Sequence, residues 1–99
     1  MKYKFDVKKV DLVNLNGEDY KEAFQKQYGI PFEKILGNLI YERTDDIDMA
    51  DMAREIHKGF AVTVSDREKE MLEKIVSDLK PSFIARQISV QFIEIKEKG

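Results

Sequence analysis

The chain has 99 residues, of which 42% are hydrophobic and 36% charged, and 17 Lys and Arg against 19 Asp and Glu give a net charge of −2. This length suits one domain with a modest core, and the charge balance lacks the basic excess of most nucleic-acid-binding proteins. The absence of cysteine excludes a disulfide framework, a thiolate zinc site and a cysteine nucleophile.

Residues 1–9 carry charges throughout, so we expect no secretory signal peptide. No apolar run approaches the roughly 20 residues that a membrane-spanning helix needs. Small secreted domains are often stapled by disulfides, which this chain cannot form. The sequence therefore predicts a cytoplasmic protein without a membrane partner.

The first segment predicts a strand. Tyr3, Phe5 and Val7 alternate with charged residues, which is the period of a half-buried strand. The alternation slips at residues 8–9, where we expect a β-bulge or the end of the strand. The Asn-Gly pair at residues 16–17 then predicts a turn.

Residues 18–28 have two interpretations. Their Glu, Lys, Ala and Gln residues favour a helix after a cap at Asn16, whereas Tyr20 could instead begin the returning strand of a hairpin. We expect the helix, with Gly29 closing it.

The most regular helical stripe runs from Phe32 to Ile40, with apolar residues at helical spacing. Pro31 is expected to be the first residue of this helix. Gly37 lies inside it and has two interpretations, which are a tolerated weakness of about 1 kcal/mol or a close crossing with another helix.

A second amphipathic helix is expected after Thr44, which is a plausible N-cap, and Gly59 is expected to end it. Residues 60–64 should be extended and pair with the N-terminal strand. Ser65 and Glu68 have the spacing of a capping box. The helix that follows them should stop at Pro81.

The C-terminal segment is ambiguous between helix and strand. Ile88 and Phe92 fit one helical face, whereas residues 90–95 are rich in strand-forming residues. We expect a helix from Ser82 to about Phe92, and a frayed tail over residues 96–99.

These elements predict a single α+β domain over residues 1–99 that is mainly helical. Three or four helices should pack on each other and on a short two-stranded β element, so that each amphipathic stripe buries one face. Residues 1–16 would form the strand region and residues 31–95 the helical core.

Candidate catalytic and metal-binding residues are sparse. The acidic cluster of Asp45, Asp46, Asp48 and Asp51 lacks the glycine and glutamate of a calcium loop, so we interpret it as the acidic first turn of a helix. His57 is the only histidine and has no second His or Cys with which to form a transition-metal site. No serine lies in a Gly-x-Ser-x-Gly setting, and the glycines form no phosphate loop. We therefore expect no catalytic residue, no metal and no cofactor.

The order of these elements resembles a group of small proteins encoded by tailed phages and prophages. In that group a strand and turn precede a Leu/Ile-striped helix, an acidic helix, an extended stretch, a Ser-capped helix and an apolar C-terminal segment. The corresponding stretches here are residues 1–17, 32–41, 46–57, 61–65, 66–79 and 83–92. The resemblance implies an accessory or assembly role and assigns no site residues.

The leading functional hypothesis is a non-catalytic protein-binding or assembly module that has a protein partner or self-associates. It predicts an exposed apolar patch. The C-terminal segment has more apolar residues than one buried face requires, which makes it the expected contact. The candidate contact residues are Phe83, Ile84, Ile88 and Phe92.

Two alternatives belong to other classes. A nucleic-acid-associated regulator would bring basic residues to one face and bind less tightly as salt rises. Those residues would be Lys2, Lys4, Lys8, Lys9 and Arg86. An enzyme with a carboxylate site would instead bring Asp48, Asp51 and His57 together. Nucleic acid is not the expected partner.

Overall fold

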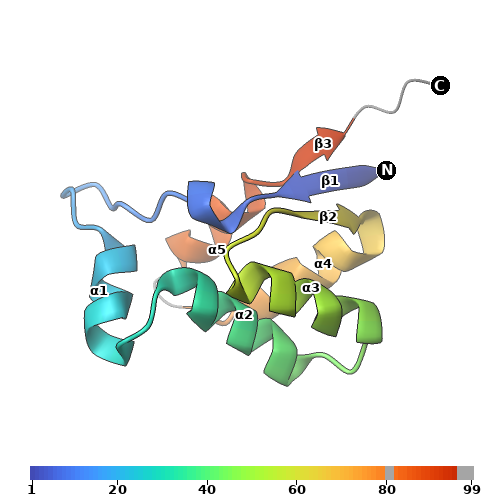
Figure 1. The fold of residues 1–99 in the computed structure, drawn as a ribbon. Coiled ribbons are helices and arrows are strands. Elements are labelled where there is room, and N and C mark those ends of the chain that lie inside the picture. The colour runs from blue at the N-terminus through green and yellow to red at the C-terminus, as the bar shows by residue number, and fades with distance from the viewer. Residues whose placement is uncertain (80–81, 96–99) are drawn as a thin grey trace.

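The computed structural model describes residues 1–79 and 82–95. Within them the chain forms five α-helices, three strands and one 3-10 helix (Figure 1). The elements in chain order are β1 (Lys2–Phe5), the 3-10 helix η1 (Val7–Lys9), α1 (Tyr20–Tyr28), α2 (Phe32–Arg43), α3 (Ile47–His57), β2 (Val62–Ser65), α4 (Asp66–Val76), α5 (Phe83–Ser89) and β3 (Ile93–Ile95).

The three strands form one antiparallel sheet in the order β2-β1-β3. Tyr3 lies opposite Val64 on β2 and opposite Glu94 on β3. Side chains alternate across a strand, so one sheet face carries Phe5 and Val64 into the core. Figure 1 shows the helices gathered on one side of the three strands, so the sheet and the helices form two layers.

The α+β class is confirmed, but the expected number of elements is wrong. Five α-helices replace the three or four expected, and the sheet has a third strand. The C-terminal helix ends at Ser89 instead of near Phe92, and residues 93–95 form β3. The β-branched Ile93 and Ile95 favour a strand, and pairing with β1 gives their backbone groups hydrogen-bond partners.

The N-terminal strand ends at Phe5, which accounts for the slip in the alternation. The Asp6 carboxylate accepts a hydrogen bond from the Lys8 backbone N–H (3.1 Å) and turns the chain into η1. The expected turn is present, because Gly17 has a φ of 83° and donates its N–H to the Asn14 carbonyl (3.0 Å).

Helix α1 confirms the helical interpretation of residues 18–28, but its cap is Asp19 and not Asn16. The Asp19 carboxylate accepts from the Lys21 N–H (2.9 Å). Asn16 lies in the preceding turn, where its N–H donates to the Asn14 side chain (3.0 Å). Gly29 closes the helix with a φ of 74°, as expected.

Two helices begin one or two residues away from the predicted positions. Pro31 occupies the N-cap of α2 instead of its first helical position. The N-cap of α3 is Asp46, whose carboxylate accepts from the N–H groups of Asp48 (2.8 Å) and Met49 (3.3 Å). The predicted cap, Thr44, accepts from the Asp46 N–H (3.1 Å) and so positions the residue that caps the helix. A carboxylate also interacts more favourably with the helix dipole than a hydroxyl does.

The capping box before α4 is confirmed in both directions. Ser65 Oγ accepts from the Glu68 N–H (3.2 Å), and Glu68 Oε1 accepts from the Ser65 N–H (2.9 Å). The extended stretch expected over residues 60–64 is present as β2 (Val62–Ser65), which pairs with β1 as expected. The expected stop at Pro81 and the expected frayed tail at 96–99 lie outside the described residues.

Replacing Ser65 by alanine should lower the free energy of unfolding by about 1 kcal/mol, because the Glu68 N–H loses its acceptor, Ser65 Oγ. Urea unfolding followed by circular dichroism measures this change. Ser82→Ala is the matched control, since Ser82 stands before α5 without a side-chain cap hydrogen bond. Equal stability losses in both variants would show that the box contributes nothing specific.

The core draws apolar side chains from β1, β2, α2, α3, α4 and α5, and from the chain between η1 and α1. Helix α1 has no fully buried residue and packs at the margin, where Phe24 stacks on Phe32 (6.0 Å between ring centroids). No polar or charged side chain among the described residues is buried. In this part of the chain, no helix has both the length and the apolar character needed to cross a membrane.

Candidate interaction surface

The four predicted contact residues lie in or against the core. Ile84 and Ile88 of α5 are fully buried. Phe92 is buried and stacks on Phe5 (5.0 Å between ring centroids), and the half-buried Phe83 meets Tyr20 edge to face (5.3 Å). These side chains therefore do not form the expected exposed patch, and that expectation is corrected. The short helix α5 packs against α4 and buries its apolar face in the core.

Exposed apolar residues of the C-terminal segment lie on β3. The exposed fraction is 58% for Ile93 and 38% for Ile95. The register places Lys4 between Thr63 and Ile93, and Lys2 beside Ile95. These side chains point away from the helices, and all are exposed. We call this surface the outer sheet face, which consists of Lys2, Lys4, Thr63, Ile93 and Ile95.

The outer sheet face continues into an open edge. β3 pairs with β1 on one side only, so backbone N–H and C=O groups on its other side have no strand partner among the described residues. Natural proteins protect such edges with proline, bulges or charges. β3 has only Glu94 as a charge, and Glu94 alternates to the opposite sheet face from Ile93 and Ile95.

The electrostatic character of the outer sheet face is basic. The cross-strand neighbours of Lys4 are Thr63 and Ile93, so neither supplies a carboxylate. None of the ion pairs between described residues involves Lys2 or Lys4. Two ammonium groups thus flank an apolar pair of isoleucines, and neither forms an ion pair with another described residue.

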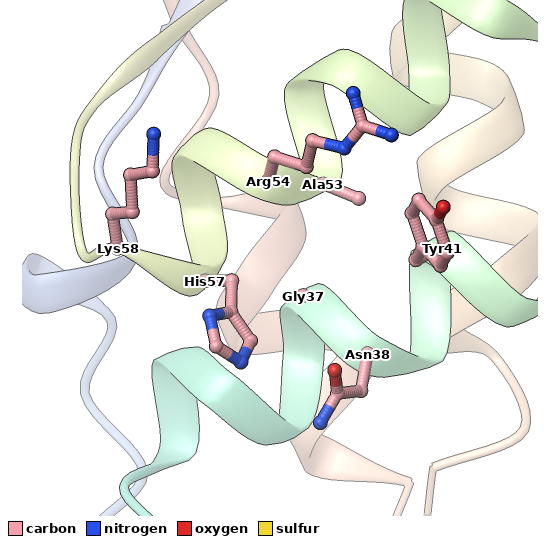
Figure 2. A pocket seen from close by; sticks show the side chains of 7 residues that line it. All are labelled: Gly37, Asn38, Tyr41, Ala53, Arg54, His57 and Lys58. Carbon is pink, nitrogen blue, oxygen red and sulfur yellow. The ribbon is translucent and has the colours of Figure 1, made fainter.

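A second feature is a hollow of about 280 Å³ where α2 crosses α3. We call it the α2–α3 hollow, and its lining residues are Gly37, Asn38, Tyr41, Ala53, Arg54, His57 and Lys58 (Figure 2). A Cβ atom at Gly37 would lie 2.7 Å from His57 Cβ and 2.9 Å from the Ala53 carbonyl oxygen. Of the two interpretations of Gly37, the close helix crossing is therefore confirmed.

The rim of the α2–α3 hollow is polar. The Arg54 guanidinium carbon lies 5.6 Å from the centroid of the Tyr41 ring, and its NH1 is 3.3 Å from the Asp51 carboxylate. The neighbouring Tyr41 raises the pKa of Arg54 above its ordinary value. In Figure 2, His57 and Asn38 lie at the other end of the hollow, and Lys58 extends away from them.

The residues of the enzyme hypothesis do not converge. Asp48 and Asp51 line a separate hollow beside β2 together with Glu55, while His57 lines the α2–α3 hollow. Among the described residues, no three His, Asp or Glu side chains are placed to hold a metal ion. Asp46 is a helix cap, and its hydrogen bond to Arg67 (2.7 Å) lowers its pKa.

The basic residues of the nucleic-acid hypothesis lie on different elements. Lys2 and Lys4 belong to the outer sheet face, whereas Arg86 is exposed on α5. The Lys8 side chain runs past Gly59, where its Cε lies 2.6 Å from the position that a Cβ would occupy. Only the first two lysines are shown to share a surface.

Sequence reasoning missed both surface features. The alternation of Ile93, Glu94 and Ile95 is a strand signal that could have indicated the outer sheet face. Gly37 was the only local signal of the α2–α3 hollow, because the residues that line it come from two different helices.

Comparison with known proteins found no matching family model, no matching curated protein and no matching solved structure.

Proposed function

We propose that this protein is a non-catalytic protein-binding or assembly module that holds its partner on the outer sheet face and the β3 edge. The observation that carries this proposal is a sheet covered on one side only, with Ile93 and Ile95 exposed beside Lys2 and Lys4. An added strand from a partner binds where an edge strand has unpaired backbone groups and exposed apolar side chains lie beside it.

The partner in this proposal supplies an extended segment. Its backbone would hydrogen-bond the open side of β3, and its side chains would cover Ile93 and Ile95. Covering each isoleucine contributes on the order of 1 kcal/mol. Acidic side chains in the partner would complement Lys2 and Lys4. Two copies meeting face to face would instead oppose these lysines, so a different, acidic partner is favoured over self-association.

An assembly role is included because of the resemblance to small tailed-phage and prophage proteins. A phage or prophage origin and a cytoplasmic location are parts of this proposal. An enzyme remains the least supported class, because Asp48 and Asp51 line one hollow and His57 another.

The experiment compares tagged proteins purified from the native cells, with light scattering on the eluted species. The double variant Ile93→Thr/Ile95→Thr keeps β-branched residues but removes apolar surface, and it should weaken partner binding at least about tenfold, as expected when a central apolar contact is lost. Ile47→Thr is the matched control, since Ile47 is an exposed isoleucine on α3.

Two results would contradict the proposal. One is a partner that binds the double variant as tightly as the natural sequence. The other is a natural protein that elutes as a monomer with nothing bound. If the natural protein forms a homodimer and the double variant does not, the binding surface is as proposed. The partner is then a second copy of this chain and not an acidic protein.

A further inference from the structure

The α2–α3 hollow has no role in the proposed protein-binding function. Gly37 and Ala53 line it at the helix crossing, where both are buried and neither has a side chain beyond Cβ. The rings of Tyr41 and His57 lie at opposite ends of the hollow (Figure 2). A cavity of about 150 Å³ holds a benzene molecule. The hollow, at about 280 Å³, therefore accommodates one flat ring with a substituent.

The ionisable groups lining the hollow are basic, apart from the Tyr41 phenol. Arg54, His57 and Lys58 line it, and no described carboxylate does. Asp51 pairs with Arg54 from outside the hollow, but this pair is exposed and such pairs contribute little. A chain of net charge −2 thus places Arg54 and His57 at this small hollow, while the Lys58 side chain extends away from it (Figure 2).

We propose that the α2–α3 hollow binds a small aromatic anion, with its ring between Tyr41 and His57 and its carboxylate or phosphate against Arg54. The guanidinium fork binds either group through two parallel hydrogen bonds. Tyr41 holds the guanidinium at the rim through its ring face. The outer sheet face lies on other elements, so this inference is independent of the proposed function.

The test is a nitrogen-15 NMR titration of the full chain at low salt, with phenyl phosphate and with benzoate. Both should give saturable shifts at the residues that line the hollow. Benzyl alcohol lacks the charge and inorganic phosphate lacks the ring, so each should bind at least about fivefold more weakly. The tighter of the two aromatic probes identifies the preferred anionic group.

Arg54→Gln should weaken binding of the aromatic anions about tenfold, because a charge-assisted hydrogen-bond pair is lost. Arg86→Gln on α5 is the matched control and should leave binding unchanged. Arg54 is largely exposed, so its variant should melt at the temperature of the natural protein. Equal binding of a comparison probe, full binding by Arg54→Gln, or shifts confined to other surfaces would each overturn the proposal.

Discussion

Replacing Phe5 by alanine should lower the free energy of unfolding by about 3–5 kcal/mol. Phe5 is 1% exposed at the end of the central strand and stacks on Phe92, which follows α5. The truncation removes a large buried surface and leaves a cavity beside the Phe92 ring. Folded domains are stable by only about 5–15 kcal/mol, so this one change removes a large share of the total. Urea unfolding measures the loss.

Phe60→Ala is the matched control, because Phe60 undergoes the same truncation at 55% exposure. Its effect should stay below about 1 kcal/mol, as for most surface substitutions. A double variant with Phe92→Ala should show a coupling of about 0.5–1.5 kcal/mol, which is typical of aromatic pairs. Equal losses for Phe5→Ala and Phe60→Ala would contradict the described packing.

Gly37→Ala should destabilise the protein by about 1–3 kcal/mol, the usual cost of overpacking a tight contact. Helix propensity alone predicts the opposite sign, since alanine stabilises a helix interior by about 1 kcal/mol relative to glycine. The added Cβ would lie 2.8 Å from His57 Cα and 2.9 Å from the Ala53 carbonyl oxygen. Both are backbone atoms, so α2 and α3 must move apart.

Asn38→Ala provides the control for Gly37→Ala. Asn38 is the next residue of α2 and is exposed, so only helix propensity should act there. The two substitutions are therefore expected to change stability in opposite directions, as thermal unfolding can show. A Gly37→Ala protein that melts above the natural protein would mean that the helices do not approach as closely as described.

Features set by a few neighbouring residues could be predicted from the sequence. The capping box at Ser65 and Glu68 is confirmed, and Gly29 and Gly59 end helices with positive φ values. Helix α1 was also expected, because its helix-forming residues outweighed the alternative hairpin. In these cases the hydrogen bonds or the backbone conformation depend on residues within one turn.

Features that depend on distant segments could not be predicted. Whether residues 93–95 form a helix or a strand is decided by β1, which offers its open side to them. The same pairing draws Phe92 onto Phe5, which is why this predicted contact residue lies in the core. The sequence also allowed two interpretations of Gly37, because the atoms that it approaches belong to another helix.

The sheet joins strands that are far apart along the chain. β1 covers residues 2–5, and its neighbours cover residues 62–65 and 93–95. Bringing such distant segments together closes long loops, whereas α2 and α3 are consecutive and meet through a short connection. Lys4, Thr63 and Ile93 therefore become neighbours only once the whole topology is in place. A partner that binds the outer sheet face would discriminate complete chains from partly folded ones.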